Sequence, residues 1–189
     1  MTWCRQVADD VWLAVAWPRT PAPDAGRRTG SPHKRYRIDR AAADRAEAAA
    51  RRAGLRAAPG RSPDARGAEW AMSRSHTRGV GAAIVAPAGH RLGVDLVAVA
   101  RVGERHARAV LRDQEWALLA FAGEIRPALA WALKEAAAKA SGDAMRCFPH
   151  GIVVGCAAEG LWVRAVEGGT PLRAGWKVLR NHVCAWIWD

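Results

Sequence analysis

One segment constrains the fold of this chain more than any other: residues 131–140, which read Trp-Ala-Leu-Lys-Glu-Ala-Ala-Ala-Lys-Ala. Strong helix formers fill the segment, Pro127 suits a first helical turn, and Gly142 suits a stop, so the pattern predicts one helix. Because an α-helix turns every 3.6 residues, five apolar residues form one stripe along it. These are Leu129, Ala132, Leu133, Ala136 and Ala140. The stripe predicts a helix that packs on a core.

A second side of the predicted helix carries Trp131, Glu135 and Lys139 at four-residue steps. A carboxylate and an ammonium are therefore presented together, one turn after an indole. An isolated Glu-x-x-x-Lys pair is usually a surface ion pair worth about 0.3–0.5 kcal/mol. The residues that precede this helix in the chain favour a further role.

The composition allows a sizeable core and indicates an anionic partner. With 189 residues, 50% of them hydrophobic, the chain can form one domain or two small ones. Its formal net charge of +11 favours nucleic acid, a phosphate-rich cofactor or an acidic protein as the partner. Composition alone does not choose among the three.

The sequence contains no apolar run of the roughly 20 residues that a membrane-spanning helix needs, so no membrane partner is expected. The N-terminal residues lack the charged-then-apolar order of a signal peptide, which predicts a cytoplasmic protein. The four cysteines are widely scattered, and we expect them to be buried, reduced thiols. They are Cys4, Cys147, Cys156 and Cys184.

Hydrophobic periodicity and turn residues divide the rest of the chain into strands, helices and loops. Strands are expected at residues 10–17, 80–86, 91–97, 152–156, 161–166 and 183–188. The second and third of these are expected to form a hairpin. Further helices are expected at residues 37–55 and 104–122, and loops at residues 18–34 and 56–68. This order predicts an α+β fold.

Asp95 is the second unusual residue, because it lies inside the otherwise apolar strand at residues 91–97. A carboxylate buried there costs several kcal/mol unless it is paired or bound to a cation. Asp95 and Glu135 lie on different elements and suit a shared Mg²⁺, which takes about six oxygen ligands and typically one or two from carboxylates. Upstream, residues 73–79 read Ser-Arg-Ser-His-Thr-Arg-Gly; we expect a polar turn that offers donors to phosphate oxygens.

The sequence has no Walker A loop and no G-x-G-x-x-G motif, which argues against an ordinary nucleotide-hydrolysis or dinucleotide site. Three segments instead resemble the ordered motifs of the 4′-phosphopantetheinyl transferases. They are Ser-Arg-Ser-His-Thr-Arg-Gly at 73–79, Gly-Val-Asp-Leu at 93–96 and Trp-Ala-Leu-Lys-Glu-Ala-Ala-Ala-Lys-Ala at 131–140. Each motif is weak alone, and the three in this order at family-like spacing are specific.

The resemblance implies a fold and a reaction. The fold would be α+β, with two related halves that form a pseudo-dimer and a shortened N-terminal half, in a monomer. We expect the halves at residues 1–90, which contribute to coenzyme A binding, and 91–189, which carry the metal and the catalytic helix. Coenzyme A would donate its phosphopantetheine arm to a serine of an acidic acyl or peptidyl carrier protein, with release of adenosine 3′,5′-bisphosphate. The carrier would serve fatty acid, polyketide or nonribosomal peptide biosynthesis.

The resemblance also assigns roles to the residues of the third motif and to Asp95. Asp95 and Glu135 would be the Mg²⁺ ligands, with Mn²⁺ as an alternative ion, and Glu135 would also take the proton of the carrier serine. Lys139 would neutralise charge on the pyrophosphate and the leaving phosphate. Lys134, the other lysine of the motif, is expected at the coenzyme.

The coenzyme end of the site is expected to draw on the N-terminal half. By the resemblance, Ser75 and His76 would hold the 3′-phosphate of coenzyme A. Arg61 would stand where larger members carry a lysine, although Ser62 departs from their pattern. Further cationic candidates, by charge and rough position only, are Lys34, Arg35, Arg37 and Arg45.

Val97 is a second departure, because larger members carry an acid two positions after the aspartate. Two carboxylates remain, and water could take the place of the third. Two alternatives therefore stay open beside the transferase. One is a basic nucleic-acid-binding module that uses arginine loops and tryptophan stacking. The other is a catalytically weakened family member that acts as a binding or scaffold protein.

Overall fold

The computed structural model describes residues 1–17, 32–57, 70–142, 149–165 and 169–189. The chain forms two compact units, Met1–Gly89 and His90–Asp189, so the division lies one residue from the predicted one. Each unit combines one antiparallel sheet with one or more helices, which confirms the predicted α+β class. Arg61, Ser62 and Cys147 lie outside the described residues, as do the side chains of Lys34, Arg35 and Arg37.

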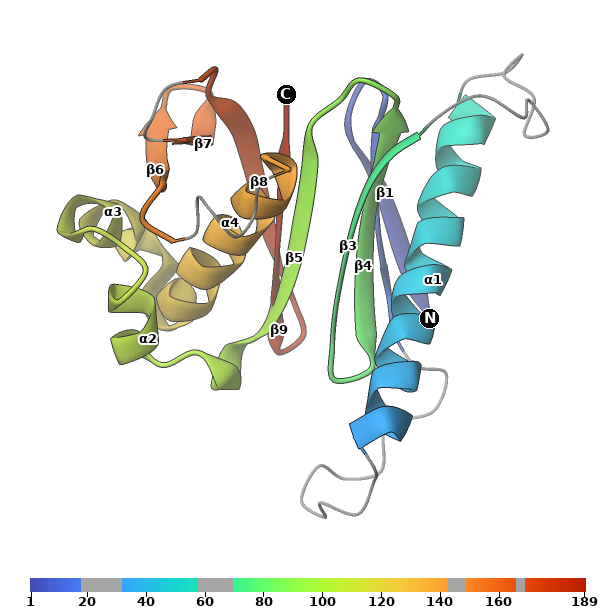
Figure 1. The fold of residues 1–189 in the computed structure, drawn as a ribbon, viewed down its shortest axis with the longest axis horizontal. Coiled ribbons are helices and arrows are strands. Elements are labelled where there is room, and N and C mark those ends of the chain that lie inside the picture. The colour runs from blue at the N-terminus through green and yellow to red at the C-terminus, as the bar shows by residue number, and fades with distance from the viewer. Residues whose placement is uncertain (18–31, 58–69, 143–148, 166–168) are drawn as a thin grey trace. The chain divides into compact units, whose positions relative to one another are not determined.

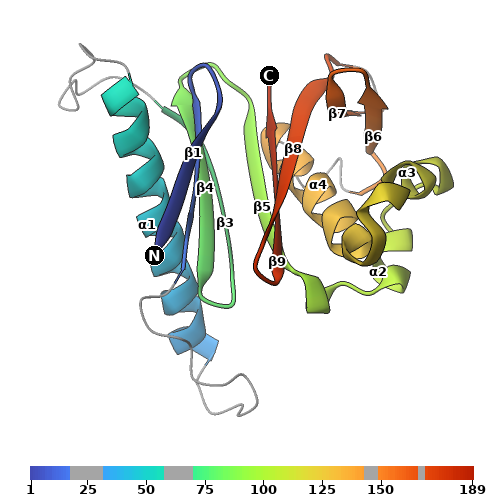
Figure 2. The same cartoon turned by 180° about the vertical axis from the view of Figure 1, so that it is seen from behind.

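The N-terminal unit is a four-stranded sheet with one helix. Its elements are β1 (Thr2–Ala8), β2 (Val11–Ala16), α1 (Pro32–Ala57), β3 (Trp70–Thr77) and β4 (Val80–Pro87). The strands follow the order β1-β2-β4-β3, and every neighbouring pair is antiparallel. Helix α1 lies along one face of this sheet (Figures 1 and 2).

Small residues allow α1 to lie close to the sheet. Its inward face is made of alanines, and Ala42, Ala43, Ala46 and Ala50 are buried. On β4, Gly81 meets the helix backbone so closely that a Cβ atom would overlap the main chain of Ala42 and Ala43. The helix begins five residues before the predicted start at residue 37, and Pro32 at its first position suits a helix start.

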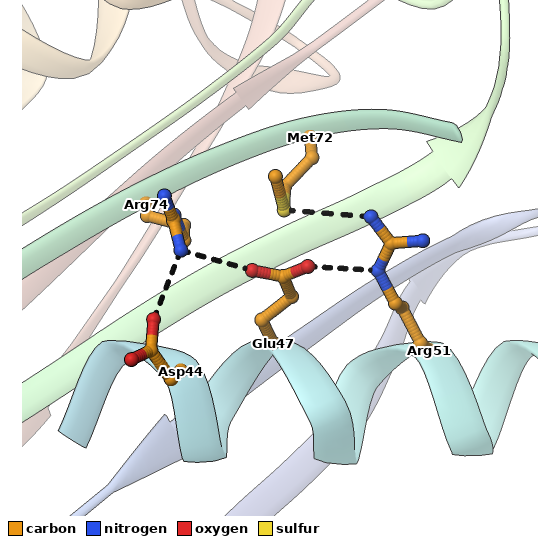
Figure 3. Close-up of polar contacts among 5 residues, drawn as sticks. All are labelled: Asp44, Glu47, Arg51, Met72 and Arg74. Carbon is orange, nitrogen blue, oxygen red and sulfur yellow. Dashed lines mark hydrogen bonds and ion pairs between the residues drawn. The ribbon is translucent and has the colours of Figure 1, made fainter. Parts of the chain in front are cut away.

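Polar side chains join α1 to the edge strand β3 (Figure 3). The Nη1 atom of Arg74 donates hydrogen bonds to Asp44 Oδ1 at 3.0 Å and to Glu47 Oε2 at 3.1 Å. The Nε atom of Arg51 donates to Glu47 Oε1 at 2.9 Å, and its Nη2 atom lies 3.9 Å from the sulfur of Met72. These side chains are partly exposed to solvent, so each ion pair contributes at most about 1 kcal/mol to stability.

The C-terminal unit is a five-stranded sheet covered by helices. Its first strand and helices are β5 (Leu92–Ala98), η1 (Val99–Arg101), α2 (Glu104–Arg108), α3 (Asp113–Leu118), η2 (Leu119–Ile125) and α4 (Arg126–Ala140). The remaining strands are β6 (Ile152–Ala157), β7 (Gly160–Ala165), β8 (Leu172–Leu179) and β9 (His182–Trp188). The sheet follows the order β5-β9-β8-β7-β6, with antiparallel pairing throughout.

Helix α4 confirms the prediction from residues 131–140. The helix includes Pro127 in its first turn, and Gly142, two residues beyond its end, has a left-handed φ of 73°. All five residues of the predicted apolar stripe are buried in one core cluster with β5, β9 and the shorter helices. Trp131, Glu135 and Lys139 are half-buried, on the side where the sequence places them.

The predicted hairpin between residues 80–86 and 91–97 is wrong. Strand β4 already has a partner on each side, β2 and β3, so it offers no edge to β5. Strand β5 pairs instead with β9, which comes from the end of the chain. Three strands were not predicted: β1, whose side chains are mostly exposed, β3, whose polar residues favour a turn, and β8, whose pattern contains Gly175.

The thiols also differ from the prediction. Cys4, Cys156 and Cys184 are free, as expected, but only Cys184 is buried. In the part of the chain that the structure describes, no helix is both long and apolar enough to cross a membrane.

Candidate active site

Asp95 lies in the middle of β5, opposite Ala185 of β9. Its side chain is only 10% exposed, and Lys139 provides the partner that such a carboxylate requires. The Nζ atom of Lys139 donates hydrogen bonds to Asp95 Oδ1 at 2.7 Å and to the carbonyl oxygen of Val94 at 3.0 Å. The ammonium of the third motif therefore bonds to the aspartate of the second.

Gly93 makes this contact possible, because it lets α4 lie directly on β5. A Cβ atom at position 93 would overlap the carbonyl oxygen of Ala136. Since alternate residues of a strand share a face, Gly93 and Asp95 both face the helix. The glycine of the Gly-Val-Asp motif thus brings the helix close, and the aspartate two residues later meets the side chains that the helix carries.

Glu135 completes a cluster of charges with Asp95 and Lys139. Burial raises the pKa of the Glu135 carboxyl, the negative charge of Asp95 raises it further, and the positive charge of Lys139 partly offsets both. The two carboxylates are therefore close enough to repel each other. An added cation would relieve that repulsion.

The residues of this cluster fit a bound Mg²⁺. Two carboxylates are the usual protein contribution, and water and substrate phosphates supply the remaining oxygens. Within the described ranges, no group of three or more His, Cys, Asp and Glu side chains could form a complete metal cage. Val97 faces the same side as Asp95, is 7% exposed and packs in the core cluster, so it adds no ligand.

Lys134 has a different role from the predicted one at the coenzyme. It is fully buried, and its Nζ atom donates to Glu115 Oε1 at 2.7 Å, to Glu115 Oε2 at 3.0 Å and to the carbonyl oxygen of Ile152. Burial lowers the pKa of this ammonium, and the hydrogen bonds to Glu115 partly offset the effect. The ammonium of Lys134 therefore points into the core of the C-terminal unit, not toward solvent, where a coenzyme would bind.

Glu115 is the residue that the sequence analysis missed. Its Oε1 atom accepts a hydrogen bond from the backbone N–H of Val154 at 2.6 Å, and its Oε2 atom accepts one from that of Arg112 at 2.8 Å. The hydrogen bond from the N–H of Arg112 to Glu115 is one of the two bonds of a helix capping box. The sequence signature of that motif begins with serine or threonine, and because Arg112 occupies this position, the motif is not recognisable from the sequence.

Ser75 and His76 lie in a strand, not in the predicted turn. Strand β3 continues to Thr77, and its side chains alternate between buried and exposed from Met72 onward. Ser75 is buried. His76 is exposed and lies on the same face of β3 as Arg74, whose side chain hydrogen-bonds to Asp44 of α1. The two side chains thus point to opposite faces, and one phosphate cannot receive both side chains in this geometry.

The predicted site residues divide between the two units. Asp95, Glu135 and Lys139 come together in the C-terminal unit, and Lys134 lies behind them in the core. Ser75 and His76 belong to the N-terminal unit. Arg45, one of the cationic candidates, is half-buried on α1.

The family comparison matches part of the C-terminal unit. Residues 91–158 match the family model of the 4′-phosphopantetheinyl transferase superfamily, and this match covers the strand of Asp95 and the helix of Glu135. The matched residues all lie in the C-terminal unit, His90–Asp189. Among solved structures, the chain is similar to the holo-[acyl-carrier-protein] synthase of Neisseria meningitidis, with 23% sequence identity and a TM-score of 0.44. That similarity covers 51% of this chain and 94% of the synthase. No curated protein matches the chain.

Proposed function

We propose that this protein transfers the 4′-phosphopantetheine arm of coenzyme A to a serine of an apo acyl or peptidyl carrier protein, in a Mg²⁺-dependent reaction. The observation that carries the proposal is the cluster of Asp95, Glu135 and Lys139, which joins two family motifs within the family-matched unit. Two coupled carboxylates and an ammonium suit a reaction that needs charge stabilisation on a pyrophosphate.

Asp95 and Glu135 would hold Mg²⁺, or Mn²⁺ in its place. When bound, the ion supplies charge neutralisation to the pyrophosphate of coenzyme A and fixes its orientation. Lys139 lies against Asp95, and its positive charge would stabilise the phosphate that leaves. Two cationic contributions would therefore act on the bond that breaks.

Glu135 would accept the proton of the carrier serine. The serine oxygen attacks the phosphorus that bears the pantetheine arm, and the bond to the adenosine-side phosphate breaks. Adenosine 3′,5′-bisphosphate leaves with the electron pair of that bond. The carboxylate of Glu135 is half-buried on the same side of α4 as Lys139, beside Asp95, which supports this role.

The charge of the chain supports an acidic carrier as the partner. In the C-terminal unit, η1 and the segment that follows it present exposed arginines, which are Arg101, Arg105, Arg108 and Arg112. The net charge of +11 would also attract the polyanionic coenzyme. Complementary charge mainly increases the association rate and the selectivity for the right partner.

Incubation with coenzyme A, Mg²⁺ and several apo carrier proteins tests the proposal. Intact-mass spectrometry should show a gain of one phosphopantetheine on the carrier, and Glu135→Gln should abolish it. Glu124→Gln is a matched control, because Glu124 is exposed in the same unit and lies outside the cluster. Transfer that persists in Glu135→Gln, or is absent from the wild-type protein with every carrier, would contradict the proposal.

A second candidate is a family member that binds coenzyme A without turnover. The packing of Val97 in the core favours it, since an apolar side chain stands where larger members have an acid. Isothermal titration calorimetry distinguishes the two. Tight coenzyme A binding together with no Mg²⁺-dependent transfer would support the binding role.

A further inference from the structure

We infer that Glu115 and Lys134 are positioning residues that, together with Gly93, aim Glu135 at Asp95. The inference rests on the proposed function, because it concerns the metal site that Asp95 and Glu135 would form. Neither Glu115 nor Lys134 would touch the substrate. They would act through the orientation of α4.

The rotation of α4 about its own axis sets the direction of Glu135. Successive residues of an α-helix point about 100° apart, so Lys134 and Ala136 point in nearly opposite directions. Glu135 lies between them, about 100° from each. Any contact that fixes both Lys134 and Ala136 therefore fixes the direction of Glu135.

Contacts on both sides of the helix fix these two residues. Ala136 rests on Gly93 with no room for even a Cβ atom between strand and helix. Lys134, on the far side, donates to both oxygens of Glu115 and to the carbonyl oxygen of Ile152. The helix is thus held between β5 on one side and the Glu115 carboxylate on the other.

Glu115 is itself fixed, which makes it a rigid anchor. Its two oxygens also accept the backbone N–H groups of Val154 on β6 and Arg112 at the start of α3. The carboxylate is 3% exposed, so water does not compete for these bonds. Buried, directional hydrogen bonds restrict rotation in a way that apolar packing alone does not.

The surroundings of α4 leave one open side. Residues on the sheet side and on the Lys134 side of the helix are buried, whereas Trp131, Glu135 and Lys139 are half-buried. A small rotation would carry Glu135 toward solvent or into the core. Either movement would separate the two carboxylates that share the proposed ion.

The test uses Mn²⁺ alone as the probe, with electron paramagnetic resonance to measure its affinity for the full chain. In Glu115→Gln/Lys134→Met the amide oxygen still accepts one of the two backbone N–H groups, the other N–H loses its acceptor, and the ion pair with α4 is removed. We expect a cooperatively folded protein whose Mn²⁺ affinity falls about tenfold or more, as for partners that orient metal ligands. Transfer kcat should fall while the KM for coenzyme A stays near the wild-type value.

The matched control is Glu47→Gln/Arg51→Met, which removes the Arg51–Glu47 ion pair on α1 and the Arg74–Glu47 pair between β3 and α1, and should leave Mn²⁺ affinity unchanged. If the first variant does not fold, Glu115→Asp takes its place as the test. It keeps both charges of the ion pair with Lys134 but shortens the carboxylate side chain by one methylene, so Mn²⁺ affinity should again fall. Wild-type Mn²⁺ affinity in a folded variant would overturn the inference. Mn²⁺ binding by the wild-type protein that Asp95→Asn does not weaken would instead overturn the proposed site, and the inference with it.

Discussion

The two units share one topology and differ in their chemistry. In the N-terminal unit, β2 leads to α1 and then to β3 and β4, and β4 lies between β2 and β3 in the sheet. In the C-terminal unit, β5 leads to the helices and then to the remaining strands, and the last strand, β9, lies between β5 and β8. In each, a glycine lets the helix lie on the strand backbone, Gly81 under α1 and Gly93 under α4. The strand order supports the expected relation between the halves, whereas the two glycines lie on strands that do not correspond, Gly81 on the last strand of its unit and Gly93 on the first.

The difference lies in what faces the helix. In the N-terminal unit the core between sheet and α1 is built from small apolar residues such as Ala14, Ala83 and Ala46. In the C-terminal unit, Asp95 lies on the face of the sheet that packs against α4, and the helix places Glu135 and Lys139 beside it. In both units the fold brings the helix close to a strand. The charged side chains at this contact in the C-terminal unit make it a candidate active site.

Removing one partner of the buried ion pair should have the largest effect on stability. Lys134→Met leaves the Glu115 carboxylate buried without its counter-charge, so we expect a loss of about 3–5 kcal/mol in the free energy of unfolding. Arg51→Met, which removes an exposed pair in the N-terminal unit, should cost less than about 1 kcal/mol. Chemical denaturation of both variants measures the contrast, and equal losses would contradict the distinction between the two helices.

Alanine substitutions at the two close-packed glycines should distinguish an effect on stability from an effect on metal binding. Gly81→Ala and Gly93→Ala both force a helix away from its strand, and each should destabilise the protein by about 1–3 kcal/mol. Only Gly93→Ala moves Glu135 relative to Asp95, so only this variant should lose Mn²⁺ affinity. Calorimetric titration of the two folded variants measures the difference. Equal Mn²⁺ affinities would show that the approach at Gly93 serves packing alone.

An acid at position 97 would test the departure from the larger members. Val97→Asp puts a third carboxylate on the face of Asp95, in the core, and should lower stability in the absence of metal. Added Mg²⁺ should then raise the melting temperature of the variant more than that of the wild-type protein, since the ion would neutralise the added charge. A melting temperature that does not respond to Mg²⁺ would show that position 97 lies out of reach of the ion.

The smallest expected effect is a pH-dependent gain in stability from Glu135→Gln. The pKa of Glu135 is raised in the folded protein, so the folded state binds its proton more tightly than the unfolded state does. Its contribution to stability is present below the ordinary glutamate pKa and is lost as the pH rises through the raised value. Glu135→Gln should therefore melt at a higher temperature than the wild-type protein at pH 7 without metal, with a smaller difference near pH 4. Thermal unfolding at both pH values measures the difference in melting temperature between the variant and the wild-type protein. A difference that is the same at pH 4 and pH 7 would contradict the expected pH dependence.

The sequence predicted what depends on local pattern. The apolar stripe of α4, the second side that carries Glu135, and the need of Asp95 for a partner all follow from periodicity and from the cost of burying a charge. The partner of Lys139 did not follow, because four-residue spacing on one helix points to Glu135, whereas the contact with Asp95 joins residues 44 positions apart. Such a contact depends on how strand and helix pack.

Lys134 and Ser75 illustrate the same limit. The sequence shows Lys134 as one cation among many, and only the fold reveals that it turns into the core toward Glu115. The polar composition of residues 73–79 favours a turn, but pairing with β4 along the whole of β3 overrides that preference. Strand pairing then places Ser75 and His76 on opposite faces, which no local pattern indicated.

The central claim is that the carboxylate pair of the C-terminal unit directs phosphopantetheine transfer. The most direct measurement follows both products of one reaction, the mass of the carrier protein and the amount of adenosine 3′,5′-bisphosphate released. Our account predicts one bisphosphate for each modified carrier, with both signals lost together in Glu135→Gln and both kept in Glu124→Gln. Bisphosphate release without modification of the carrier, or modification that survives in Glu135→Gln, would contradict it.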